Sequence, residues 1–143
     1  MIAVKPAPGL VISYRFLWHE QRKRGQEEGH KERPCLILGT EREADGSLLI
    51  VVLPITHAPP VDPELAKEVP AAVRKHLQLD DERCWIVLGE ANIFYWPGMD
   101  LCRSAPGDSL VYERVPPRLF EKVRREYLAL ARAGRARAVK RTG

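Results

Sequence analysis

The sequence predicts an α+β fold, a mostly antiparallel β-barrel with one short internal helix and a C-terminal amphipathic helix. Short apolar segments with the periodicity of strands, divided by turn signals, fill most of the chain, and one long segment near its end has helical spacing. With 143 residues, 45% hydrophobic and 29% charged, the chain has the size and composition of one globular domain. We therefore expect a single domain over residues 1–133, followed by a basic tail, 134–143, that is frayed or disordered.

The first predicted strand begins at residue 10. Every second residue is large and apolar, the pattern of a strand that buries one face: Leu10, Ile12, Tyr14, Phe16 and Trp18. Residues 19–33 are dominated by charged and amide side chains, with Gly25 and Gly29 among them. Such a segment has no apolar face to bury, so we expect a long mobile loop.

A β-hairpin is predicted next. Residues 34–38 and 48–55 are rich in isoleucine, valine and leucine, and the pair Asp45-Gly46 between them is a strong tight-turn signal. After a proline-rich crossing, Pro70 suits the first turn of a short helix that runs to about Leu77.

Further strands are predicted over residues 84–89 and 93–96, where Pro97-Gly98 marks a turn, and near residues 109–113. After Pro116-Pro117, apolar residues recur at helical spacing: Leu119, Phe120, Val123, Tyr127, Leu130 and Ala131. This stripe predicts the C-terminal amphipathic helix.

Composition narrows the classes of function. No window approaches the roughly 18 apolar residues of a membrane span, and prolines and a lysine occupy the N-terminus where a secretory signal needs an apolar run, so we expect a cytoplasmic protein without a membrane partner. Cys35, Cys84 and Cys102 are odd in number and widely spaced, which favours buried reduced thiols over disulfides or a zinc site. We expect no cofactor.

The net charge of +4 is unevenly distributed. Residues 118–143 hold nine basic residues against two acidic ones, a local charge of +7. A basic segment can attract phosphates or an acidic partner, although such runs are more often solvated faces or tails.

Two short motifs carry a family resemblance. Residues 31–35 read Lys-Glu-Arg-Pro-Cys, and residues 53–57 read Leu-Pro-Ile-Thr-His. They resemble the PemK/MazF toxin family, whose members have a basic residue just before Arg-Pro at the start of the second strand and Pro-hydrophobic-Thr at the end of the third. The resemblance implies an SH3-like barrel of the Kid/PemK/CcdB type, a homodimer, a cognate antitoxin and metal-independent cleavage of single-stranded RNA, which inhibits growth.

Metal-free RNA cleavage uses the neighbouring 2′-hydroxyl as nucleophile, so the site must accept a proton and stabilise charge on the phosphoryl group. The resemblance implies three catalytic residues. Arg33 supplies the cation, because a guanidinium stays charged and can fork two hydrogen bonds onto phosphate. Thr56 directs a hydroxyl at the phosphate, and Glu90 falls near an acidic position proposed as the general base.

Five further residues are predicted to bind substrate. Lys31 and His57 adjoin the catalytic pair in the two motifs. Asn92 can hydrogen-bond a base edge, and Tyr95 and Trp96 can stack on bases, an interaction worth about 1–3 kcal/mol per base in single-strand binders.

Other interpretations remain open. Arg33 can simply pair with Glu32 or Glu28 on a solvated loop, and aromatic residues at a strand end are more often core. The chain can also be a non-catalytic CcdB-like module that inhibits a protein target such as DNA gyrase, because fold does not determine function. A third possibility is a housekeeping or structural protein that binds nucleic acid weakly.

Overall fold

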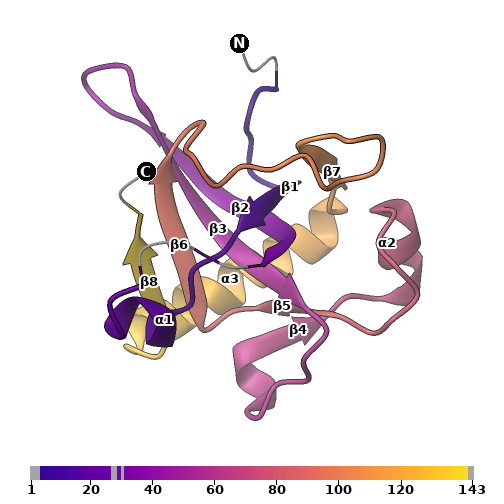
Figure 1. The fold of residues 1–143 in the computed structure, drawn as a ribbon. Helices are drawn as coiled ribbons and strands as arrows, with labels where there is room; N and C mark the ends of the chain where they lie inside the picture. Colours follow the sequence, from indigo (N-terminus) through magenta and orange to yellow (C-terminus); the bar gives the residue numbers. More distant parts are fainter. Residues whose placement is uncertain (1–3, 27–28, 30, 142–143) are drawn as a thin grey trace.

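The computed structural model describes residues 4–26, 29 and 31–141 (Figure 1). In chain order, its elements are β1 (Leu10–Arg15), α1 (His19–Lys23), β2 (Glu32–Arg42), β3 (Leu48–Thr56), the 3₁₀ turn η1 (Pro63–Leu65), β4 (Ala66–Glu68), α2 (Ala71–His76), β5 (Trp85–Val87), β6 (Glu90–Tyr95), β7 (Val111–Arg114), α3 (Pro117–Arg132) and β8 (Arg137–Lys140). The predicted hairpin, the short helix after Pro70 and the C-terminal helix are confirmed.

One sheet contains the described strands. Its main path runs β4-β5-β3-β2-β1-β7, with β6 paired to β3 and β8 paired to β6. Every pairing is antiparallel except that of β6 with β8. The α+β class and the dominance of antiparallel strands are thus confirmed, while the hydrogen-bonded path through the described strands does not close into a barrel.

Strand β3 has three neighbours, and this arrangement positions the site. Its first half pairs with β6, from Leu49 to Val52, and its last two residues pair with β5 instead. On its other side it pairs with β2 as far as Pro54, which lies opposite Cys35. Because β2 and β3 are antiparallel, the start of β2 and the end of β3 lie at the same edge of the sheet.

The two faces of the sheet bury separate apolar clusters. One lies between the sheet and α3, which crosses behind the sheet in Figure 1, and includes Val11, Leu36, Leu53 and Val123. The other, on the opposite face, is built around Ile12, Cys35, Ile37, Val52 and Phe94. Neighbouring residues of β1 and β2 alternate between the clusters, as the period of a strand requires.

Strand β1 differs from its prediction in two respects: it ends at Arg15, before Phe16 and Trp18, and it is buried on both faces. Its second face, represented by Val11 and Ser13, is as fully buried as the first. Neighbours β2 and β7 cover both edges of β1, and α3 packs beneath it, so no face remains for solvent. Cys35, Cys84 and Cys102 are free and buried, as expected.

The predicted loop over residues 19–33 is wrong at both ends. His19–Lys23 form α1, and β2 already begins at Glu32. Helix α1 has no apolar stripe that could signal it in the sequence. Side-chain hydrogen bonds to the backbone fix its start. The side chain of Gln21 accepts from the backbone N–H of Trp18 at 3.0 Å, and Glu90 accepts from that of His19 at 2.7 Å. Residues 27, 28 and 30 of the predicted loop lie outside the described residues.

The frayed tail predicted for residues 134–143 is also wrong over its described part. Residues Arg137–Lys140 form β8, which pairs in parallel with β6. The strand buries Val139 but exposes its neighbours, which is why the sequence lacks an apolar stripe there. Residues 142 and 143 lie outside the described residues.

A buried arginine fixes this last strand. The guanidinium of Arg141 lies 2.6 Å from the carboxylate of Asp100, in an ion pair whose side chains are 2% and 12% exposed. It also donates to the backbone oxygen of Arg15 at 2.9 Å and to the side chain of Asn92 at 3.1 Å.

Among the described helices, none combines the length and apolar composition needed to cross a lipid bilayer.

Replacing Arg141 by alanine should lower the free energy of unfolding by about 3 kcal/mol, because the change removes its largely buried ion pair with Asp100. Urea unfolding measures the loss. Arg137→Ala is the matched control, since this exposed arginine lies on β8, the strand that Arg141 follows. Equal losses in the two variants would contradict a specific anchoring role for Arg141.

Candidate functional site

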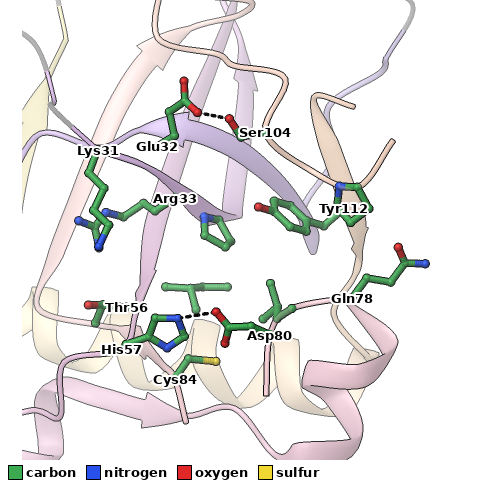
Figure 2. A pocket seen from close by; sticks show the side chains of 14 residues that line it. Lys31, Glu32, Arg33, Thr56, His57, Gln78, Asp80, Cys84, Ser104 and Tyr112 are labelled. Carbon is green, nitrogen blue, oxygen red and sulfur yellow. Dashed lines mark hydrogen bonds and ion pairs between the residues drawn. The ribbon is translucent and has the colours of Figure 1, made fainter. Parts of the chain in front are cut away.

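A pocket of about 380 Å³ opens at the sheet edge where β2 begins and β3 ends (Figure 2). Its volume lies within the range of ligand sites in proteins. Besides the strand ends, the loop after α2 and the segment leading to β7 contribute to it. Its lining consists of Lys31, Glu32, Arg33, Pro34, Ile55, Thr56, His57, Gln78, Leu79, Asp80, Cys84, Ser104, Pro106 and Tyr112.

Arg33 is the central cation of the pocket. Its side chain is partly buried, with the guanidinium carbon 5.3 Å from the centre of the Trp18 ring, a cation–π distance. Burial lowers its pKa. In the part of the chain that the structure describes, its Nε is buried with no hydrogen-bond partner. A partly buried guanidinium with an unused donor is suited to receive an anion.

Within the described residues, Arg33 does not form the ion pair with a neighbouring glutamate that an ordinary loop residue would form. Glu32 points elsewhere, with its carboxylate 3.0 Å from Arg15 and in hydrogen-bond contact with the hydroxyl of Ser104. That hydroxyl and Arg15 lower the pKa of Glu32. Glu28 lies outside the described residues. Arg33 forms none of the ion pairs found between described side chains.

Lys31 and Thr56 lie beside Arg33. Figure 2 shows the side chains of Lys31 and Arg33 reaching to the same side of the pocket, above Thr56 and His57. Thr56 ends β3, and its hydroxyl accepts from the backbone N–H of Ala58 at 3.2 Å. That contact leaves the hydroxyl proton of Thr56 available to donate to an oxygen in the pocket.

Hydrogen-bond acceptors face both ring nitrogens of His57. Its Nδ1 lies 2.9 Å from the carbonyl oxygen of Arg83, and its Nε2 lies 2.9 Å from the carboxylate of Asp80. Both neighbours are acceptors, so each ring nitrogen must donate. The carbonyl of Arg83 raises the pKa of His57 most, and Asp80 and Glu82 raise it further against the opposing effect of burial. These neighbours favour the protonated form of His57, in which its charge is paired with that of Asp80.

The opposite end of the pocket is more apolar. Tyr112 enters from β7 with its hydroxyl directed into the pocket (Figure 2), and the lining also includes the apolar residues Pro34, Ile55 and Leu79. The thiol of Cys84 lies at the floor, and burial raises its pKa to about 11, so it is a poor nucleophile. The pocket is therefore cationic at one end and apolar at the other.

One group of potential metal ligands adjoins the pocket among the described residues: His57, Asp80 and Glu82, all exposed, with ligand atoms within 4.8 Å of one another. Asp80 faces Nε2 of the imidazole, whereas Glu82 lies 3.7 Å from Nδ1. A metal ion bound to one ring nitrogen would therefore lie close to only one of the two carboxylates. The arrangement is better suited to hydrogen bonds from the imidazole than to metal coordination.

The structure brings together four of the predicted site residues, Lys31, Arg33, Thr56 and His57. Glu90 lies outside the pocket lining, where its carboxylate caps the start of α1. A carboxylate there is favourable because the N-terminus of a helix carries partial positive charge.

Asn92 is fully buried, so its predicted contact with a base edge is not available. Its side-chain oxygen accepts from the backbone N–H of Leu17 at 2.8 Å, and its nitrogen donates to the Leu17 carbonyl at 2.8 Å. Residues 17–19 therefore form a junction: the backbone of Leu17 binds Asn92, the ring of Trp18 lies against Arg33, and the N–H of His19 binds Glu90.

The two predicted stacking residues also lie away from the pocket. The ring of Tyr95 is partly exposed, with the amino group of Lys140 on β8 5.8 Å from its centre. Trp96 packs against the apolar cluster of the sheet and lies 6.3 Å from the ring of Phe94. Trp96 thus belongs to the core, as the alternative interpretation expected, whereas Tyr95 is exposed on β6 away from the pocket.

Sequence reasoning named only four of the lining residues, and those it missed include Gln78, Asp80 and Tyr112. Each lies on a segment far in sequence from the two motifs, so only the tertiary fold brings them to Arg33. The sequence contains one signal for Gln78. This residue follows the predicted end of a helix, at a position where glycine is usual.

The pKa shift of His57 predicts a pH-dependent stability. Because the folded-state pKa is raised, this histidine stabilises the fold fully below its unfolded pKa, about 6.5, and the contribution is lost as pH rises through the folded pKa. His57→Gln should therefore destabilise the protein more at about pH 5.5 than at about pH 9. Urea unfolding at both pH values measures the difference. A loss independent of pH would contradict the protonated state assigned to His57.

Comparisons with protein families, with curated proteins and with solved structures find no match for this chain. The pocket itself therefore carries the case for function. It unites the two sequence motifs into one cationic site, since the start of β2 supplies Lys31 and Arg33 and the end of β3 supplies Thr56 and His57.

Proposed function

We propose that this pocket binds a phosphodiester of single-stranded RNA and that the protein is a metal-independent endoribonuclease of the toxin type. The observation that carries the proposal is Arg33, a partly buried guanidinium with an unused buried Nε in the described structure. Lys31, Thr56 and protonated His57 line the same pocket. This set can neutralise and orient a phosphate, which is the main requirement of phosphoryl transfer.

The proposed reaction forms a bond between the ribose 2′-oxygen and phosphorus and breaks the bond from phosphorus to the 5′-oxygen. The products are a 2′,3′-cyclic phosphate and a free 5′-hydroxyl. Charge builds on the phosphoryl oxygens in the transition state, where Arg33 and Lys31 stabilise it and the hydroxyl of Thr56 fixes one oxygen.

Two proton transfers complete the reaction. The leaving 5′-oxygen takes a proton from a group that lines the pocket, Lys31 or His57. We assign the acceptor of the 2′-hydroxyl proton to a carboxylate that lines the pocket. Asp80 and Glu32 both line the pocket and each is paired with a cation, and we name Asp80 as the base that the variants below test.

The same proposal includes an SH3-like barrel, a homodimer and neutralisation by a cognate antitoxin. The exposed face of α3 supports an acidic partner, because Arg118, Lys122 and Arg125 surround a shallow hollow there. Positive charge on that face attracts an acidic chain and speeds its association.

Arg33→Ala should reduce cleavage of single-stranded RNA at least about 100-fold, the scale of losing one transition-state donor. The assay contains EDTA and separates the fragments on a gel. Arg33→Lys is the matched variant, which keeps the charge but loses the bidentate fork and should retain partial activity.

Wild-type protein that cuts no single-stranded RNA, or Arg33→Ala that cuts it equally well, would overturn the proposal. Growth arrest that persists in Arg33→Ala cells with intact RNA would instead favour the CcdB-like alternative, a module that inhibits a protein such as DNA gyrase.

A separate variant tests the general base. Glu90→Gln should retain cleavage within a few-fold, because the Glu90 carboxylate binds the backbone of His19 and lies outside the pocket lining. Asp80→Asn should lower the rate and change its pH profile, since it removes the proposed base. The reverse pattern would return the role of base to Glu90.

A further inference from the structure

Three consecutive backbone N–H groups, those of residues 17–19, donate to side chains instead of to other backbone groups. The acceptors for residues 17, 18 and 19 in turn are the side-chain oxygens of Asn92 at 2.8 Å, Gln21 at 3.0 Å and Glu90 at 2.7 Å. Two of these acceptors belong to β6. The backbone that carries the indole of Trp18 is therefore attached to the sheet on both sides.

The side chain of Trp18 is also held in place. Its ring packs edge to face against the buried ring of Phe16, with 5.0 Å between the ring centres. The guanidinium carbon of Arg33 lies over the same indole, 5.3 Å from its centre. The backbone of Arg33 is fixed by its pairing with Tyr14 on β1. Both members of this cation–π contact thus start from fixed backbone.

The contact decides how Arg33 can meet an anion. The N–H donors of a guanidinium lie in its plane, so a ring over one face leaves the edges available to a phosphate. Among the described residues, the Nε of Arg33 has no hydrogen-bond partner, and its guanidinium forms no ion pair. In this part of the chain, stacking on Trp18 takes the place of a polar partner in orienting the cation.

The position of Trp18 depends on Glu90. Helix α1 has five residues, from His19 to Lys23, and so short a helix has little stability of its own. The carboxylate of Glu90 holds the first of these residues to β6. Without that hydrogen bond the start of α1 is released, and the indole loses one of the two points that fix it to the sheet.

We propose that Glu90 is a positioning residue for the phosphate site and acts through Trp18 on Arg33. Glu90 does not line the pocket, so its effect passes through the backbone of His19 and the indole before it. A guanidinium that loses this support samples more orientations and directs its donors at a phosphate less often. The consequence for RNA rests on the proposed function, whereas the orientation of Arg33 can be measured without RNA.

Nuclear magnetic resonance of the ¹⁵N-labelled protein measures that orientation. A proton close to the face of an aromatic ring resonates upfield of its usual position. The Nε–H signal of Arg33, identified by its loss in Arg33→Lys, should lie upfield of the signals of exposed arginines. Glu90→Ala should shift it to the range of those arginines. Glu90→Gln keeps an oxygen that accepts from the N–H of His19 and should leave it in place.

The same variants are compared in RNA cleavage and binding. Glu90→Ala should lower kcat/KM about ten-fold, the scale of a desolvated cation–π contact, and Glu90→Gln should stay within a few-fold of the wild type. The Kd of an uncleavable 2′-O-methyl RNA oligomer, followed by fluorescence anisotropy, should rise by a similar factor. Glu20→Ala is the matched control. It removes the same charge from an exposed position in the first turn of α1 and should change neither the signal nor the rate.

Substitutions of Trp18 test the contact separately from the stability of α1. Trp18→Phe keeps an aromatic face and should retain part of the upfield shift, whereas Trp18→Leu should abolish it. An Arg33 signal that stays in place in Glu90→Ala, or equal losses of cleavage in Glu90→Ala and Glu90→Gln, would overturn the positioning role. A signal that moves as expected in a protein that cuts no RNA would overturn the proposed nuclease and keep the action of Glu90 on Arg33.

Discussion

The antiparallel pairing of β2 with β3 is the interaction on which the fold and the site both depend. It places alternate residues of the two strands in the two apolar clusters, and α3 packs against one of them. The pair Cys35 and Pro54 ends this ladder, and beyond Pro54 strand β3 changes its partner to β5. Arg33 and Thr56 lie just outside that last pair, so the pairing that builds the core also aims the functional side chains.

Much of the fold could be predicted because its signals are local. The Asp45-Gly46 turn, the proline before α2 and the apolar stripe of α3 each act within a few residues. Helix α1 and strand β8 could not be found in this way, because distant groups stabilise them: Glu90 caps α1, and Asp100 holds the arginine that follows β8. A charged segment and a basic tail look disordered until such partners are known.

The site was predictable to the same extent. Four of its residues lie in two motifs at the ends of two strands that pair as a hairpin. The predicted hairpin alone therefore places these motifs at the same edge of the sheet. Glu90 and Asn92 were predicted from their position after a β-like run, but β6 pairs with the first half of β3 and directs them toward α1 and Leu17. Asp80 and Tyr112 enter from loops whose approach to the pocket is decided only by the tertiary fold.

The junction formed by residues 17–19 has a consequence for observing this protein. The indole of Trp18 lies against the guanidinium that we assign to the phosphate, while the residues on either side of it are fixed to β6. An anion arriving at Arg33 changes the electric field at an immobilised chromophore. The chain thus carries one of its three tryptophans, a fluorescent indole, directly against the proposed phosphate site.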